Sequence, residues 1–311
     1  MKKSKLISIS LILFLIIFVL VSTPKKGVVY PYTLMISSGD TLYSVSEELE
    51  KEGVVRHGDL LRAFVVFFGK DKYLQTGEYL FEKPLYVWQV AKYISGNEHL
   101  QNQVKITFPE GYTVDDMAFA IEKNLPSINK DEFISLYSDQ EGYLFPDTYF
   151  FWPSSSAAEI GEVMMDNFTQ KTKDLFASYT GDMTQEDIVI LASIIEKESS
   201  GDDDRYIISG ILHNRLDKGM LLQVDATLTY ILGKSSKELT LSDLKIDSPY
   251  NTYVYKGLPP GAIANPGFAS IEAAMYPQST PYYFYLHDSE GNTYYAVDHE
   301  GHVNNKNKYL K

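Results

Sequence analysis

The chain has 311 residues, a mass of 35.3 kDa and 44% hydrophobic residues, which is enough for folded domains with cores of their own. It carries 28 Lys and Arg against 41 Asp and Glu, a net charge of −13, which argues against a nucleic-acid binder because such proteins need a clustered basic face. The absence of Cys excludes disulfides, thiolate nucleophiles and Cys-ligated zinc. The six His show no metal-ligand spacing, so we expect no metal site.

An uncharged apolar segment lies close to the N-terminus. Residues 6–23 would be roughly 27 Å long as a helix, near the hydrocarbon thickness of a bilayer. Lys2, Lys3 and Lys5 precede it, which favours a cytoplasmic N-terminus. The residues after it lack the small-x-small pattern of a cleaved secretory signal, the alternative reading. We therefore expect a cytoplasmic tail over 1–5, a single transmembrane helix over 6–23 and an extracytoplasmic body.

The segment 24–108 alternates between strand and helix patterns. Alternation over 33–37 predicts a strand, and Gly39-Asp40-Thr41 opens a helix that ends at Gly53. The remaining expected elements are a helix over 59–68, a strand over 77–81, a helix over 84–96 and a strand over 103–108. This pattern predicts a small α/β subdomain.

The strand, Gly-x-Thr turn and helix occur twice, 72 residues apart. Gly39, Thr41, Leu42, Val45 and Leu49 recur as Gly111, Thr113, Val114, Met117 and Ile121. A Thr at such a turn can cap the helix that follows, so a structural role explains both turns as well as a functional one.

The segment 109–311 is richer in aromatic and turn residues. The expected helices are 157–179, 185–199, 206–217 and 270–275, and a Pro- and Gly-rich loop covers 248–267. Strands over 282–286 and 293–297 flank a Gly291-Asn292 hairpin turn. The whole chain is therefore expected to be α+β, with one N-terminal transmembrane helix, a small membrane-proximal subdomain and a larger mixed domain.

A carboxylate at the end of a buried helix is the strongest chemical signal. Eight residues from Ile188 to Ile195, all apolar except Ser193, precede Glu196 and Glu198. Desolvation at such a site raises the pKa of a carboxyl group, as a general acid requires. The two Glu flank opposite sides of the buried face, so a helical wheel does not choose between them. Ordinary surface charges at a helix end are the alternative.

Five motifs resemble the YceG-like endolytic murein transglycosylases. They are Leu191 to Glu198, Glu141 to Tyr149, Asn214 to Leu216, Met220 to Asp225 and Ser248 to Gly267. The resemblance implies that Glu196, the first Glu of the EKE run, is the catalytic acid. Ser38 to Leu42 is similar to the opening of LysM glycan-binding modules, which implies a LysM-like subdomain over 24–108 and a catalytic domain over 109–311.

The resemblance also implies the chemistry. Glu196 would protonate the β-1,4 glycosidic oxygen between N-acetylmuramic acid and N-acetylglucosamine, then take the proton of the muramic acid C6 hydroxyl to close a 1,6-anhydro ring. No cofactor is required. The implied location is the bacterial cell membrane, and the implied role is termination of nascent strands, with peptidoglycan synthases and division or elongation proteins as partners.

Hydrogen-bonding residues in these motifs are candidates for contact with sugar. They are Glu141, Gln223, Asp225, Asn251 and Tyr253. For Gln223, Asp225, Asn251 and Tyr253, hydrogen bonds to their own loop backbone are the favoured alternative. Glu141 could equally cap a helix or hold the turn of its motif. Arg205 and Arg215 are expected to pair with the Asp202 to Asp204 run or with Asp225.

Two other functions remain open from the sequence. A hydrolytic muramidase would need a second carboxylate, which Asp225 or Glu141 could supply. A wall-binding scaffold would use the LysM-like part, and Glu196 would then be structural.

Overall fold

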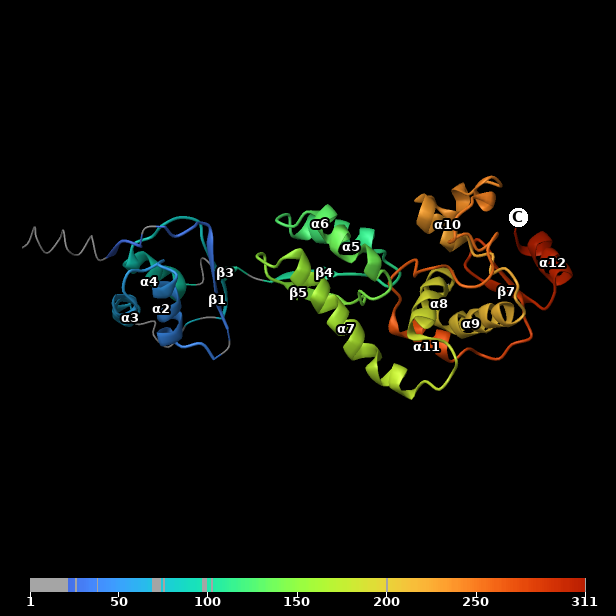
Figure 1. The fold of residues 1–311 in the computed structure, drawn as a ribbon, viewed down its shortest axis with the longest axis horizontal. Coiled ribbons are helices and arrows are strands. Elements are labelled where there is room, and N and C mark those ends of the chain that lie inside the picture. The colour runs from blue at the N-terminus through green and yellow to red at the C-terminus, as the bar shows by residue number, and fades with distance from the viewer. Residues whose placement is uncertain are drawn as a thin grey trace, which may run out of the picture. The chain divides into compact units, whose positions relative to one another are not determined.

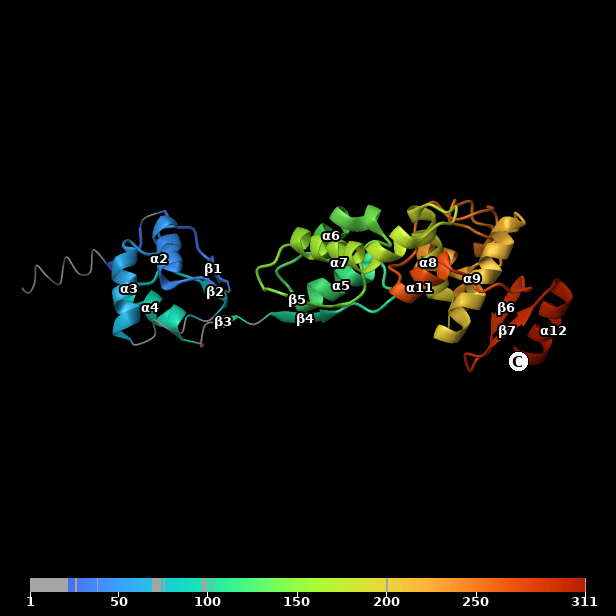
Figure 2. The ribbon, with the colours of Figure 1, turned by 90° about the horizontal axis from the view of Figure 1, so that it is seen from below.

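The computed structural model describes residues 22–25, 27–37, 39–68, 74, 76–96, 100–101, 103–199 and 201–310, which form a mixed α+β fold. The chain divides into two compact units (Figures 1 and 2). The first contains the residues up to Val104 together with Trp152–Ser154, and the second contains Lys105–Phe151 and the residues from Ser155 onward.

In its described residues, the first unit packs three helices against an antiparallel sheet of order β1-β2-β3. Its elements are β1 (Tyr32–Ile36), α2 (Leu42–Lys51), α3 (Gly58–Phe67), β2 (Gly77–Phe81), α4 (Val87–Ser95) and β3 (Leu100–Gln101). Leu34 of β1 is paired with Tyr79 of β2, and both side chains are buried. Val45 and Leu49 of α2 and Ile94 of α4 are buried in the same core, which closes the unit around one apolar centre.

The second unit is largely helical. It contains β4 (Val104–Thr107), α5 (Val114–Asn124), α6 (Lys130–Tyr137), η1 (Ser138–Gln140), β5 (Thr148–Phe151), α7 (Ala157–Ser178), α8 (Gln185–Glu198), α9 (Asp202–Asp217), α10 (Asp225–Leu232), η2 (Ser236–Glu238), η3 (Asp243–Lys245), α11 (Phe268–Met275), β6 (Phe284–His287), β7 (Thr293–Ala296) and α12 (His299–Tyr309). Strand β4 pairs with β5, and β6 pairs with β7 in an antiparallel hairpin.

Helix α8 lies at the centre of the second unit. It packs against α9, α10 and α11, as Figure 1 shows for α9 and α11. Every residue from Ile188 to Ile195 is buried, so the expectation of a central helix is confirmed. The apolar sequence of α8 thus anchors the surrounding elements and fixes where its charged last turn emerges.

Both repeated turns act as helix caps. The Thr41 side chain accepts the N–H of Ser44 at 3.1 Å, and the Thr113 side chain accepts that of Asp116 at 3.1 Å. The glycines before them adopt positive φ angles, 101° at Gly39 and 78° at Gly111. The structural explanation of the repeat is therefore confirmed.

Several elements differ from the sequence expectations. Helix α9 begins at Asp202, four residues before the expected start, because the acidic residues 202–204 form its first turn. Helices α6, α10 and α12 were not predicted. None of the side chains of α12 is buried, so its sequence lacks an apolar stripe that would reveal it.

The predicted fold class needs one correction. In the described part of the chain, no helix combines the length and apolar composition needed to cross a membrane. The longest, α7, has 22 residues and carries charges along its length, among them Glu162, Asp166 and Lys173. Apart from its last two residues, the segment 6–23 predicted as an anchor lies outside the described residues. The fold is therefore corrected to a mixed α+β one whose described residues contain no transmembrane helix.

Candidate active site

The last turn of α8 sends its two carboxylates to different neighbours. Thr184 caps the start of α8. The packing of α8 against α9, α10 and α11 holds the other end of the helix in place. The two Glu side chains leave this turn two residues apart, so they face different sides of α8. Their contacts decide which of them can meet a substrate.

Glu196 is held by protein groups. One carboxylate oxygen lies 3.8 Å from the guanidinium group of Arg205, and both side chains are less than a tenth exposed. The other oxygen accepts the backbone N–H of Gly267 at 3.0 Å. These contacts join α8 to the first turn of α9 and to the loop before α11.

Glu198 is in a different environment. Tyr285 of β6 donates a hydrogen bond to its carboxyl group at 2.8 Å, and the backbone N–H of Ala226 also donates to it. Burial raises the pKa of the Glu198 carboxyl group and Asp225 adds to that rise, while these two hydrogen bonds and His287 act in the opposite direction. The carboxyl group therefore keeps its proton to a higher pH than an exposed Glu, as a general acid requires.

A cavity of about 720 Å³ opens beside Glu198. Its lining includes three of the residues predicted to bind substrate: Gln223, Asp225 and Tyr253. Asp225 accepts a hydrogen bond from the Tyr253 hydroxyl at 2.6 Å. Three of the five predicted binding residues therefore lie beside Glu198, whereas the two oxygens of Glu196 contact Arg205 and Gly267. Which of the two carboxyl groups is the acid stays a prediction.

Gln223 stands at the rim of this cavity with an unusual backbone. Its φ angle is 50°, the one positive value at a non-glycine residue in the described part of the chain. Its N–H donates to Thr252 O at 3.0 Å, which fixes the turn. The side chain is exposed, so it is available to a ligand in the cavity.

Asn251 makes the hydrogen bonds to loop backbone that the sequence offered as the alternative to contact with sugar. It is fully buried, and its amide group donates to Leu244 O and Ile246 O at 3.2 and 2.8 Å. Its side-chain oxygen accepts the N–H of Tyr253 at 3.0 Å. All of these partners are backbone groups, so Asn251 positions the loop that carries Tyr253.

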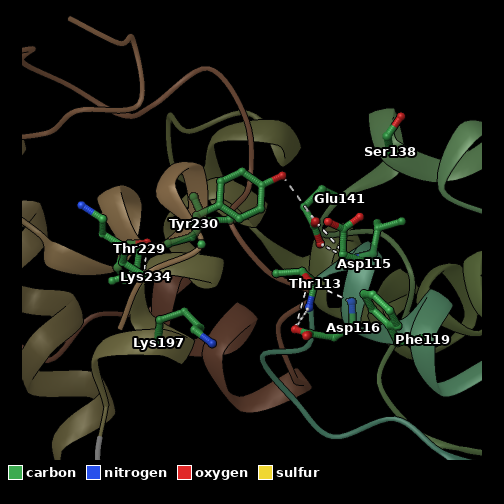
Figure 3. A pocket seen from close by; sticks show the side chains of 14 residues that line it. Thr113, Asp115, Asp116, Phe119, Ser138, Glu141, Lys197, Thr229, Tyr230 and Lys234 are labelled. Atoms are coloured by element: carbon green, nitrogen blue, oxygen red, sulfur yellow. Dashed lines mark hydrogen bonds between the residues drawn. The ribbon is translucent and has the colours of Figure 1, made fainter. Parts of the chain in front are cut away.

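Glu141 lies in a second cavity, of about 560 Å³ (Figure 3). Its carboxyl group accepts the N–H of Val114 at 3.1 Å, the Asn265 amide at 2.8 Å and the Tyr230 hydroxyl at 3.4 Å. Burial raises its pKa to about 7. The predicted capping role is confirmed, because Val114 is the first residue of α5, whereas contact with a ligand stays a prediction. Lys197 lines both cavities.

Arg205 and Arg215 contact different partners, and in the described part of the chain no ion pair joins Arg215 to an Asp. Arg205 meets Glu196. Arg215 donates to the backbone oxygens of Tyr283 and Leu222, and its guanidinium group lies 5.2 Å from the centre of the Phe284 ring. Arg215 thereby holds the start of β6 against α9, which positions Tyr285 next to Glu198.

Two residues of the cavity were missed in the sequence. Tyr285 and His287 are two residues apart on β6, so they share one face of the strand. The alternation of the strand pattern could have placed both side chains on one face, but it does not show that this face lies next to Glu198. In the part of the chain that the structure describes, no group of three His, Asp or Glu is arranged to hold a metal ion.

Comparison with known proteins agrees with these motifs. The chain matches the YceG-like family over residues 34–308. It is 30% identical to the "Endolytic murein transglycosylase" of Bacillus subtilis, with 88% of this chain and 84% of that protein covered. It is 28% identical to the protein of the same name in Streptococcus pneumoniae, of which it spans 57%.

A solved structure supports the same relationship. The crystal structure of a putative yceG-like protein from Listeria monocytogenes superposes with a TM-score of 0.58 at 30% identity, covering 88% of this chain and 98% of that one. The match of motifs, sequence and fold shows that this chain belongs to the YceG-like family.

Proposed function

We propose that this protein is an endolytic murein transglycosylase and that Glu198 is its catalytic acid. The observation that carries the proposal is the position of the Glu198 carboxyl group, whose pKa burial raises, at the wall of a cavity of about 720 Å³. The similarity to proteins named endolytic murein transglycosylase supplies the reaction class.

One carboxyl group serves both steps. Glu198 gives its proton to the glycosidic oxygen of the bond between N-acetylmuramic acid and N-acetylglucosamine, and positive charge develops at the muramic acid C1. The resulting carboxylate takes the proton of the C6 hydroxyl, whose oxygen then bonds to C1 and closes a 1,6-anhydro ring. The Tyr285 hydroxyl and the Ala226 N–H stabilise the carboxylate between the steps.

A pair of matched variants tests the assignment. Glu198→Gln removes the proton donor and leaves the size of the side chain unchanged, so we expect strand cleavage to fall by at least a hundred-fold. Glu196→Gln, two residues away, keeps a side-chain oxygen for Gly267 and should retain most of the activity. Mass spectrometry of uncrosslinked strands incubated with the full chain gives both rates. Loss of activity in Glu196→Gln alone would return the acid to Glu196.

A hydrolytic muramidase is the second candidate, and Asp225 favours it. Asp225 is near enough to Glu198 to raise its pKa, and it is held by Tyr253 in the same cavity. A second carboxylate at such a site can orient a water molecule or stabilise C1. The products decide between the two reactions, because a transglycosylase leaves anhydro-muramic ends and a muramidase leaves reducing muramic ends.

The biological setting is also part of the proposal. Peptidoglycan lies outside the cytoplasm, so the catalytic part, residues 109–311, acts there. Cleavage within nascent strands would terminate their elongation and bring the protein near peptidoglycan synthases and division or elongation proteins. Residues 24–108, which include the LysM-like segment Ser38 to Leu42, would assist by binding glycan. Strand binding without any cleavage by the wild type would favour the scaffold function instead.

A further inference from the structure

The cavity beside Glu198 is basic, although the protein as a whole is acidic. The chain has a net charge of −13, yet four permanent cations line this cavity, Lys197, Arg215, Lys237 and Lys306, against the two carboxyl groups of Glu198 and Asp225. Charges of one sign in a concave site focus the electrostatic potential and attract ligands of the opposite sign.

The two carboxyl groups of the cavity do not neutralise these cations. Burial favours the protonated form of Glu198, and Asp225, which accepts a hydrogen bond from the Tyr253 hydroxyl, offsets no more than one of the four cations. Arg215 is bound to backbone oxygens. In the described part of the chain, no ion pair joins Lys197, Lys237 or Lys306 to a carboxylate. We call these three lysines the basic wall.

The basic wall is assembled from three separate elements. Lys197 comes from the last turn of α8, where it also donates to Gly111 O at 3.3 Å, and Lys237 comes from η2. Lys306 comes from α12, which lies beside the β6–β7 hairpin at the C-terminal end of the unit (Figure 2).

Helix α12 turns one face to the cavity. His299, His302, Val303 and Lys306 are its lining residues, and their spacing of three, four and seven places them on a single side of the helix. The Phe284 ring packs against both histidine rings, with centroids 6.1 and 5.5 Å away, and so fixes the helix to β6. A polar helix with no buried residue is thus held where its basic side faces the cavity.

Lys306 supplies the positive charge on this face of α12. Burial lowers the pKa of His302, and Lys306, Arg215 and His299 lower it further, so His302 is largely neutral at pH 7. The neighbouring cations that disfavour a proton on His302 also favour the binding of an anionic ligand.

We propose that the basic wall binds the free carboxylates of the peptide side arms on the muramic acid residues of the strand. This inference rests on the proposed function, because it names a substrate feature recognised at the same site. In a peptide-bearing strand the lactyl carboxyl groups are in amide bonds to the peptides, so the free carboxylates of the peptides are the anionic groups that the strand offers. The wall therefore makes the protein selective for strands whose peptides carry free carboxylates.

The test compares three substrates with the full chain at 50 mM NaCl. They are peptide-bearing strands, the same strands with their carboxyl groups converted to methylamides, and peptide-free strands whose only carboxylates are on the lactyl groups. We expect kcat/KM to be about ten-fold higher on the peptide-bearing strands than on either of the others. Raising the salt to 0.5 M should reduce this preference, because the wall is exposed to solvent.

Variants connect the preference to the basic wall. Lys237→Gln and Lys306→Gln should each lower kcat/KM on peptide-bearing strands by roughly two- to five-fold, and the double variant by about ten-fold, with little change on methylamide strands. Lys173→Gln, at an exposed site on α7, is the matched control and should change neither.

Three results would overturn the inference. The double variant could keep the wild-type preference, or it could slow all three substrates equally. Peptide-free strands could also match the peptide-bearing ones, in which case the lactyl carboxylate is the recognised group. If the wild type cleaves no strand, the proposed function fails. The affinities of Glu198→Gln for the same three strands then test the inference, which requires tighter binding of the peptide-bearing strands than of the other two.

Discussion

The carboxyl group of Glu141 should make the stability of the second unit depend on pH. It is buried among Val114, Tyr230 and Asn265, and its pKa rises from 4.5 to about 7 on folding. Between these values the unfolded chain has lost the proton and the folded chain has kept it, so stability falls as pH rises. Each pH unit is worth about 1.4 kcal/mol, which gives a loss of roughly 3 kcal/mol across the window.

Glu141→Gln isolates this effect. Glutamine has the size of a protonated glutamate, keeps one oxygen to accept a hydrogen bond and does not ionise. We expect the variant to be within about 1 kcal/mol of the wild type near pH 4.5. It should gain roughly 3 kcal/mol relative to the wild type by pH 8, because only the wild type then has to hold a buried charge.

The assay is guanidinium unfolding at several pH values, followed by the near-ultraviolet circular dichroism of tyrosine. The only two tryptophans, Trp88 and Trp152, both belong to the first unit, so their fluorescence reports that unit separately and serves as an internal control. A difference between variant and wild type that stays constant from pH 4.5 to pH 8 would refute the reasoning.

Two further predictions follow from the contacts of the site. Tyr285→Phe removes a hydrogen bond that lowers the pKa of Glu198. The basic limb of the pH profile of kcat should therefore move to higher pH, and kcat should fall about ten-fold. An unchanged profile would show that Tyr285 does not influence the catalytic acid. Gly142→Ala should destabilise the second unit by about 3 kcal/mol in the same unfolding assay, because Gly142 has a φ of 94° and an added Cβ would lie 2.6 Å from Val189; wild-type stability would contradict the packing.

Local sequence patterns were sufficient for the elements with strong periodicity or clear caps. The run from Ile188 to Ile195 can be buried only in a helix that is covered on all sides, and α8 is that helix. Thr41 and Thr113 begin helices because the hydroxyl group accepts a nearby N–H, an interaction that spans three residues. Short-range interactions of this kind depend little on the remainder of the fold.

The sequence was a weaker guide where tertiary contacts stabilise an element. Helix α12 has no buried side chain of its own and is held through Phe284, which comes from another element. Its basic face contributes to the cavity because packing on β6 places α12 beside Glu198. The cavity and its charge therefore arise from residues that are distant in the chain.

The choice between Glu196 and Glu198 shows the division between sequence and structure most clearly. The sequence by itself determined a buried helix that ends in two carboxylates on opposite sides, together with the family to which the chain belongs. Only the tertiary structure decided which carboxylate meets the cavity, because the partners lie far along the chain. Gly267, 71 residues away, engages Glu196, whereas Tyr285, 87 residues away, engages Glu198 in the cavity. A helical wheel contains no information about such distant neighbours, and these neighbours set the burial and the pKa of each carboxyl group.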